Sequence, residues 1–226
     1  MLGRLKFSQG GRGKMESAGL YGLPVLQTRV DPDGWLSRWS MERAARTMHK
    51  AGVIRTLLPQ DFEDEMWLRR WGFRRVDCAA FLQAQSPALA EAALRQRDID
   101  PKRACVKLRG ERAGESMFRC AAQLCNRVRY LSVDVSRGGE ELASWLRWEF
   151  GVVVLPVGEP TQLSLCFQQV CSEHEETELE LYGHRPRLGG LRLWVPAFEE
   201  EEQENLELMS VLWERGKLGE EELKFT

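Results

Sequence analysis

The residues most able to do chemistry follow a short apolar segment, Ala104 to Leu108, which we interpret as a strand. The next stretch, Arg109 to Gly114, is polar and contains glycine, and an amphipathic segment typical of a helix begins at Ser116. A strand that passes through a glycine turn into a helix leaves backbone N–H groups free at the helix N-terminus, where they bind phosphate. We therefore take Arg109 and Gly110 as candidate cofactor-binding residues.

The same order of elements follows directly along the chain. The run Tyr130 to Val135 predicts a second strand, and Glu140 to Phe150 predicts a helix with carboxylates in its first turn. Between them lie Arg137, Gly138 and Gly139, a cation and two flexible residues before a helix N-terminus. Such a turn can present several N–H groups to an anion, so these three are also candidate binding residues.

Asp134 completes the candidate site. It lies near the end of the second strand, 24 residues after Gly110, about where the ribose-binding carboxylate of a dinucleotide site stands. The stretch therefore resembles the Rossmann nucleotide-binding fold in plan. If the strands are parallel, their carboxyl ends meet at one edge of the sheet, and Arg109, Asp134 and Arg137 share one crevice there.

The glycine pattern departs from the fingerprint of that fold. The second glycine of Gly-x-Gly-x-x-Gly would stand where this chain has Arg112, and Glu111 and Glu115 place negative charge beside a phosphate position. We therefore expect no cofactor. The alternative is NAD or another nucleotide, bound by a degenerate fingerprint.

No other motif predicts chemistry. The glycine-rich run from Gly10 to Lys14 lacks the following Ser or Thr of a phosphate-binding loop and instead predicts a hairpin turn. The histidines His49, His174 and His184 are too far apart in the sequence to predict a metal site. The sequence also lacks the Gly-x-Ser-x-Gly motif of a nucleophile elbow. We expect no catalytic residue and no metal.

The elements that position these residues form a β-α-β-α-β unit from Ala104 to Val157. An upstream segment repeats it, because Trp67-Leu68-Arg69 recurs as Trp145-Leu146-Arg147 at an offset of 78 residues. A doubly wound sheet commonly consists of two such halves. The sequence therefore predicts an α/β, Rossmann-like fold with an open, mostly parallel sheet built from two β-α-β-α-β units.

The C-terminal part has a different pattern. Glu178 to Tyr182 and Gly190 to Val195 predict two strands, which we expect to pair as an antiparallel hairpin at the sheet edge. A helix from Leu206 to Arg215 and a short strand from Glu222 to Phe225 follow. We expect one compact domain with an N-terminal α/β half, a second Rossmann-like half, and a C-terminal hairpin and helix, which span residues 1–103, 104–170 and 171–226.

The composition is ordinary for a globular protein, with 43% hydrophobic and 29% charged residues. No apolar run approaches the roughly 18 residues that span a bilayer, and the N-terminus lacks the pattern of a signal peptide. The six cysteines form no Cys-x-x-Cys pair, which fits free thiols in a reducing compartment. We therefore expect a cytoplasmic protein with no membrane contact.

The charge is divided unevenly along the chain. Residues 1–113 hold 21 Lys and Arg against 13 Asp and Glu, whereas residues 114–226 hold 11 against 21. In the sequence the basic residues look scattered and lack interleaved aromatic residues. We therefore expect the two charges to attract each other within the fold or within a homo-oligomer, and we expect no nucleic-acid partner.

The leading hypothesis is a non-catalytic, Rossmann-like protein that acts in binding or assembly, with a protein partner of unknown kind or a second copy of itself. The alternative is a nucleotide-dependent enzyme of the NAD(P) type, with Asp134 on a ribose and the Gly110 turn near phosphates. The scaffold alone does not decide between them, because it carries many unrelated functions. Nucleic-acid binding by the basic half ranks third.

Overall fold

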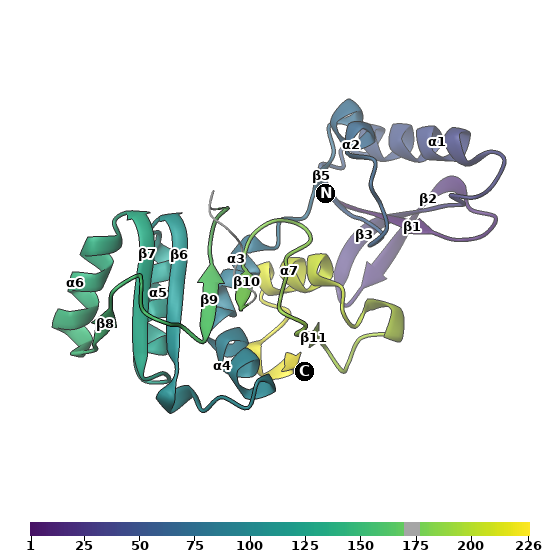
Figure 1. The fold of residues 1–226 in the computed structure, drawn as a ribbon. Helices are drawn as coiled ribbons and strands as arrows, with labels where there is room; N and C mark the ends of the chain where they lie inside the picture. The colour runs from purple at the N-terminus through teal and green to yellow at the C-terminus, as the bar shows by residue number, and fades with distance from the viewer. Residues whose placement is uncertain (170–176) are drawn as a thin grey trace. The chain divides into compact units, whose positions relative to one another are not determined.

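A computed structural model describes residues 1–169 and 177–226 of the chain (Figure 1). Cys171 and His174 lie outside the described residues. The chain divides into two compact units. Unit 1 consists of residues 1–76 and 207–217, and unit 2 consists of residues 77–206 and 218–226.

Unit 1 is built on a five-stranded sheet with the strand order β2-β3-β1-β4-β5. Strand β1 is parallel to β3 and β4, and β4 is parallel to β5, whereas β2 is antiparallel to β3. The sheet is therefore mostly parallel, as the sequence predicts. Its elements in chain order, closed by the C-terminal helix α7, are β1 (Leu2–Phe7), β2 (Arg12–Leu20), β3 (Leu23–Val30), α1 (Ser37–Lys50), β4 (Arg55–Leu57), α2 (Glu65–Trp71), β5 (Arg74–Arg75) and α7 (Leu206–Glu214).

The core of unit 1 lies between the sheet and helices α1 and α2. Small residues bring α1 close to the strands: Ala44 and Ala45 are fully buried, and a Cβ on Gly13 would come within 2.3 Å of the Ser40 carbonyl oxygen. The α2 helix begins at Glu65, and the Asp64 side chain accepts the capping hydrogen bond from the Trp67 N–H at 2.8 Å.

Unit 2 contains a five-stranded sheet with the strand order β10-β9-β6-β7-β8, and every pair in it is parallel. Counted along the chain, this order reads 3-2-1-4-5 from one edge, which is the doubly wound, Rossmann-like order. The elements in chain order are α3 (Ala79–Ala84), α4 (Ser86–Gln96), η1 (Pro101–Arg103), β6 (Cys105–Arg112), α5 (Glu115–Leu124), β7 (Tyr130–Arg137), α6 (Gly139–Phe150), β8 (Val154–Leu155), β9 (Leu163–Cys166) and β10 (Glu178–Glu180).

An antiparallel two-stranded extension is present, but its strands are β11 (Leu193–Trp194) and β12 (Lys224–Phe225). The pairing predicted between Glu178–Tyr182 and Gly190–Val195 is wrong. Strand β10 instead pairs in parallel with β9, because its alternating residues give Leu179 an apolar neighbour in Leu165. Two short 3-10 helices, η2 (Glu200–Glu202) and η3 (Glu220–Glu222), complete this part.

The two faces of the unit 2 sheet differ in polarity. The residues on one face are apolar, and helix α5 packs on this face, since Met117 fills the space beside Gly110. Because side chains alternate along a strand, the other face carries two polar rows across the aligned strands. The first row contains Lys107, Ser132, Ser164 and Glu178, and the second contains Arg109, Asp134, Cys166 and Glu180.

The repeat seen in the sequence has a structural counterpart. Leu68 in α2 and Leu146 in α6 are both buried, and both helices end at a glycine with positive φ, Gly72 and Gly151. Each glycine leads into a short parallel strand, β5 or β8. The two units differ in strand order, because β1 lies between β3 and β4 in unit 1, whereas β6 and β7 are neighbours in unit 2.

Among the described residues, no helix has the length and apolar content required to cross a membrane.

Candidate functional site

The candidate residues of the sequence lie at the carboxyl edge of the unit 2 sheet, but the turns there are shorter than predicted. Strand β6 continues to Arg112, and the Ala113 N–H donates to the Arg137 carbonyl at 2.9 Å. Gly110 therefore lies within a strand. After β7, Gly138 alone makes the turn, with φ +77°. The continued pairing of β6 with β7 shortens both turns, and local sequence does not reveal this pairing.

Arg109 and Asp134 are brought together, as the sequence predicts for neighbouring strand ends. The Arg109 Nε lies 3.2 Å from Asp134 Oδ2, and its Nη1 lies 2.8 Å from Glu178 Oε2. The side chains of Arg109 and Glu178 are each 5% exposed, whereas that of Asp134 is 38% exposed. Asp134 is thus engaged by a buried guanidinium, which in turn neutralises a buried carboxylate on β10.

The Gln168 side chain forms hydrogen bonds with the backbone of β6 at the point where β6 and β9 separate. Its Oε1 accepts from the N–H groups of Glu111 and Arg112 at 3.0 and 2.9 Å, and its Nε2 donates to the Arg112 carbonyl at 3.3 Å. The strand order of the sheet reverses between β6 and β9. In a doubly wound sheet a ligand binds outside the carboxyl ends of the strands at this point of reversal. Here a side chain of the protein already uses the backbone groups that would face such a ligand.

The remaining three candidate residues lie beside this edge without joining the buried pair. Arg137 Nη2 is 3.9 Å from Glu111 Oε1, and both side chains are mostly exposed. A Cβ on Gly138 would lie 3.3 Å from the Ala113 Cβ, so the two turns are in close contact. Gly139 is buried, and the first turn of α6 after it carries two glutamates, which repel an anion.

Two thiols of unit 2, those of Cys120 and Cys166, are poor nucleophiles. Burial, reinforced by the neighbouring Glu178 carboxylate, raises the pKa of Cys166 to about 12. Burial also raises the pKa of Cys120 to about 12. Within residues 1–169 and 177–226, His, Cys, Asp and Glu side chains form no group of three or more that could hold a metal ion.

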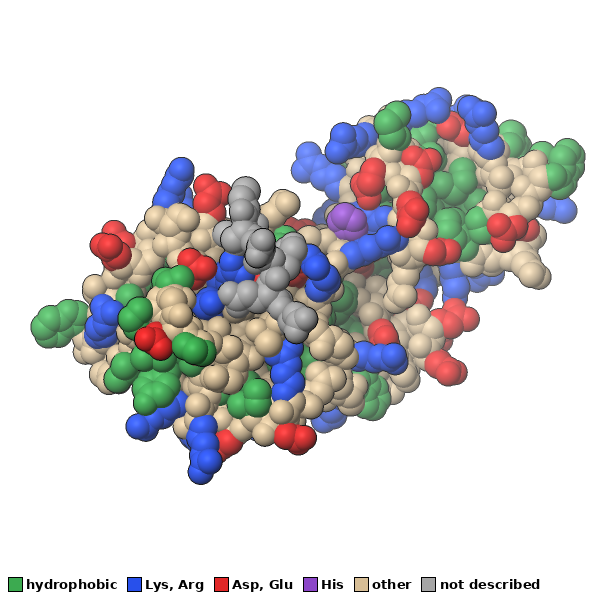
Figure 2. All heavy atoms as spheres, viewed as in Figure 1, with side chains coloured by type: hydrophobic (Ala, Val, Ile, Leu, Met, Phe, Trp, Pro, Cys, Tyr) green, Lys and Arg blue, Asp and Glu red, His purple; other side chains and the backbone are tan. Residues whose placement is uncertain are grey.

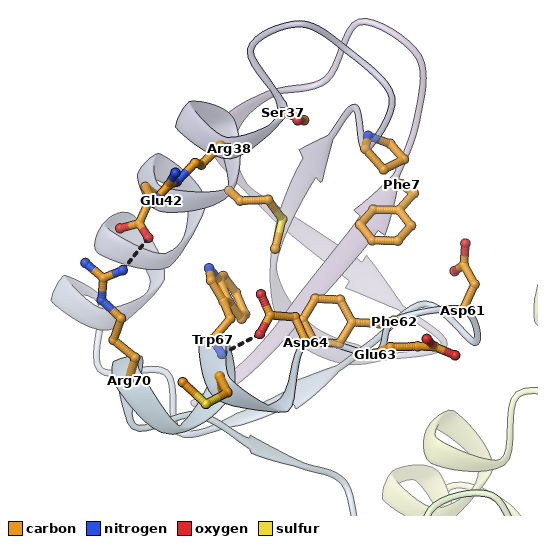
Figure 3. Close-up of a pocket in the computed structure, with 13 residues that line it drawn as sticks. Phe7, Ser37, Arg38, Glu42, Asp61, Phe62, Glu63, Asp64, Trp67 and Arg70 are labelled. Atoms are coloured by element: carbon orange, nitrogen blue, oxygen red, sulfur yellow. Dashed lines mark hydrogen bonds and ion pairs between the residues drawn. The ribbon is translucent and has the colours of Figure 1, made fainter.

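A pocket of about 770 Å³ lies in unit 1, at the carboxyl ends of its parallel strands (Figure 3). Phe7 is the last residue of β1, Pro32 follows β3, and Asp61 follows β4, and all three line the pocket. Its volume falls in the range of about 300–1,000 Å³ that is typical of small-molecule sites. This is the edge at which open α/β sheets bind ligands.

The pocket has an aromatic floor. Phe62 and Trp67 are 3% and 6% exposed, and their rings meet edge to face at 5.6 Å. Phe7 packs on Phe62 with 6.3 Å between ring centres. The indole N–H of Trp67 is buried and has no acceptor among the described residues. A buried N–H group without an acceptor costs about 1–3 kcal/mol, so this side chain is held at an energetic cost.

Charged groups lie at opposite ends of the pocket. Arg38, Glu42 and Arg70 stand on the side of α1 and α2, where Arg70 Nη1 lies 3.0 Å from Glu42 Oε1 (Figure 3). In the part of the chain that the structure describes, Arg38 has no acidic partner. Asp61 and Glu63 stand at the other end, beyond the Phe62 ring (Figure 3). The pocket therefore offers an unpaired cation at one end and a carboxylate pair at the other, with Phe62, Trp67 and the Asp64 carboxylate between them (Figure 3).

The sequence did not predict this pocket. Its residues come from three separate segments, which only the parallel pairing of β1 with β3 and β4 brings together. The signal that could have revealed it is the acidic and aromatic run from Asp61 to Trp67, which directly follows a strand.

No family model matches the chain, and no curated protein matches its sequence. Among solved structures, it is similar to an L-tryptophan dehydrogenase from Nostoc punctiforme at 14% identity and TM-score 0.33, over 73% of this chain and 55% of that one. It is also similar to a shikimate 5-dehydrogenase from Listeria monocytogenes, in complex with shikimate and NAD, at 9% identity and TM-score 0.28, over 73% and 67%.

A shikimate 5-dehydrogenase-like protein matches at 11% identity and TM-score 0.27, over 73% of this chain and 65% of that one. The chain thus spans 55% to 67% of the length of these proteins. At such scores the likeness carries no argument about function, and the fold assignment rests on the strand order.

Proposed function

We propose that this protein is a non-catalytic binding protein and that its ligand site is the pocket of unit 1. The observation that carries the proposal is the contrast between two sheet edges. At the carboxyl edge of unit 2, Gln168 and the Arg109 ion pairs use the groups that a ligand would need. At the corresponding edge of unit 1 there is a ligand-sized pocket with an unpaired cation.

The proposed ligand is a dipeptide with apolar side chains, because its ammonium and carboxylate groups stand at opposite ends of the molecule, whereas a single α-amino acid carries both on one carbon. Its anionic end pairs with Arg38, its cationic end lies near Asp61, and its apolar body covers Phe62 and Trp67. The separation of the two charges across the aromatic floor supports this choice (Figure 3). A purely anionic ligand would meet the carboxylates at the far end, and a purely cationic one would leave Arg38 unpaired.

The test is a thermal-shift and calorimetric comparison of matched ligands. Dipeptides of L-phenylalanine and of L-leucine are compared with their methyl esters, which lack the anion, and with their N-acetyl derivatives, which lack the cation. The parent compounds should bind most tightly, because a charge-assisted contact is worth about tenfold or more in affinity. At 100 times its dissociation constant, a ligand adds about 2.7 kcal/mol to stability, which gives a clear shift.

Variants identify the ends of the pocket. Arg38→Ala should weaken the affinity for the parent compound about tenfold and leave the affinity for the methyl ester unchanged. Asp61→Asn should weaken the affinity for the parent compound about tenfold and leave the affinity for the N-acetyl derivative unchanged. Arg147→Ala, at an exposed arginine of unit 2, is the matched control. If the dipeptides do not bind, or if Arg38→Ala affects acid and ester equally, the proposed ligand class is wrong.

The second candidate function is a nucleotide-dependent enzyme, which is supported by the doubly wound strand order of unit 2 and by the partly exposed carboxylate of Asp134. It predicts a thermal shift with NAD, NADP, ATP or S-adenosylmethionine that Asp134→Ala abolishes. The proposal of a non-catalytic protein predicts no shift with any of the four. A shift that depends on Asp134 would overturn the non-catalytic proposal.

A further inference from the structure

One outward stripe of helix α1 combines exposed aromatic and basic side chains. At 3.6 residues per turn, Trp39, Arg43, Arg46 and Lys50 fall within about 60° of the helix circumference. The opposite side of the helix carries Ala44, Ala45 and Met48, which are fully buried in the core of unit 1. The stripe therefore faces away from the core.

The aromatic end of the stripe is strongly exposed. Trp39 is 53% exposed, and Trp35, which precedes the helix, is 93% exposed. The guanidinium of Arg43 lies 5.3 Å from the centre of the Trp39 ring, so it can stack with a flat group placed on that ring. A shallow groove of about 340 Å³ follows these residues along the helix to Lys50.

The basic end of the stripe is not neutralised within the protein. Among the residues that the structure describes, Arg43, Arg46 and Lys50 have no acidic partner. Glu42, the acidic residue of the groove, is paired with Arg70 of α2. Lys and Arg side chains gather along the outer side of α1 and α2 (Figure 2). The surface thus has a net positive charge next to two exposed indoles, which corrects the expectation that the basic residues lack aromatic neighbours.

We propose that this stripe binds single-stranded nucleic acid. Bases stack on Trp35 and Trp39, and successive phosphates pair with Arg43, Arg46 and Lys50. From Trp39 to Lys50 the stripe is about 16 Å long, and its cations follow one another at about 4.5 and 6 Å along the axis. Stacked aromatic residues in line with cations are the arrangement that holds single strands without reading their sequence.

An anionic membrane is the main competing partner, and the geometry disfavours it. A membrane-surface helix buries a continuous apolar face along its length, with cations beside it. Here the apolar face of α1 is already buried in unit 1, and the exposed indoles stand at one end of the stripe. A duplex is also disfavoured, because its bases are stacked on each other and cannot stack on indoles.

The test is fluorescence anisotropy with a fluorescein-labelled oligothymidylate about 12 nucleotides long, and with the oligouridylate of equal length. Binding should weaken with salt, with a slope of log affinity against log salt of about −2 for three phosphate contacts. Trp39→Ala should weaken binding about tenfold. Replacing Arg43, Arg46 and Lys50 together by Gln should bring the slope close to zero.

Matched controls come from an exposed helix of unit 2. Trp148 is 89% exposed on α6 and lies next to Arg147, so Trp148→Ala and Arg147→Gln remove the same side-chain types from another surface. These controls should leave binding unchanged. Circular dichroism of every variant establishes that it is folded.

Several outcomes would overturn the proposal. These are no binding at low salt, equal losses in the Trp148→Ala and Trp39→Ala proteins, equal affinity for a duplex, or Trp39-dependent binding to phosphatidylserine vesicles without binding to either oligonucleotide. Binding of the DNA or of the RNA strand supports it, and the tighter of the two identifies the natural chemistry.

Discussion

The buried ion pairs of unit 2 give a quantitative prediction about the role of Asp134. Replacing Arg109 by Met removes the guanidinium that lies 2.8 Å from Glu178, whose side chain is 5% exposed. Removing one partner of a buried pair leaves the other charge less well compensated and costs up to about 3–5 kcal/mol. Replacing Asp134 by Ala should cost less than about 1 kcal/mol, because its side chain is 38% exposed and its pairing is screened by water.

The assay is urea denaturation at pH 7, followed by circular dichroism. Because the chain forms two compact units, the transition of unit 2 is fitted separately wherever the two transitions do not coincide. The double variant Arg109→Met, Glu178→Leu should recover much of the loss, since an apolar pair of similar volume can replace a buried ion pair at little cost.

Two results would refute this reasoning. One is a smaller loss in the free energy of unfolding for Arg109→Met than for Asp134→Ala, and the other is a loss in the double variant that exceeds the sum of the losses in its two single variants. The first result would mean that Arg109 mainly pairs with the exposed carboxylate of Asp134, as in a ligand site. The predicted result would mean that Arg109 stabilises the buried end of β10.

Three further predictions concern other groups. Gln168→Ala removes three hydrogen bonds to β6 and should lower the free energy of unfolding by about 1–2 kcal/mol, whereas Gln169→Ala at the next, exposed position should change it little. Burial raises the pKa of Glu207 above its ordinary value of 4.5, so the folded protein favours the protonated form more than the unfolded chain does. The stability that the raised pKa contributes is fully present below pH 4.5 and is lost as the pH rises through the pKa of the folded protein. Over this pH range the Glu207→Gln variant should therefore gain stability relative to the wild type, which denaturation at several pH values measures. Cys120 and Cys166 should remain unmodified by iodoacetamide at pH 8 in the folded protein and react after unfolding, which peptide mass mapping measures, and rapid native-state modification would contradict their burial.

Much of the fold can be predicted from local patterns. The helix predicted from Glu140 to Phe150 matches α6, Gly139–Phe150, to within one residue, and Gly151 ends it in the left-handed conformation. The order of helices and strands in unit 2 follows from the same periodicity. Such features depend on neighbours within a few residues, so the sequence contains them directly.

The site depends on contacts between distant residues and could be predicted only in part. Arg109 and Asp134 could be placed together because parallel strands align their carboxyl ends. That Gln168 occupies the edge depends on hydrogen bonds to residues 56 and 57 positions away. By contrast, both the spacing of the basic residues on α1 and its apolar face, which includes Ala44, Ala45 and Met48, follow from the sequence.

The central claim is that the ligand site lies in unit 1 and that the nucleotide-like edge of unit 2 is closed. The most direct measurement is the ¹H–¹⁵N spectrum, with the Trp67 indole group assigned by replacement with Phe and the Gly138 backbone amide as the reporter of the unit 2 edge, during titration with the dipeptides and, separately, with NAD. The dipeptides should move the Trp67 resonance, and NAD should move neither resonance. Movement of the Gly138 resonance by NAD, with Trp67 unaffected by every dipeptide, would contradict the claim.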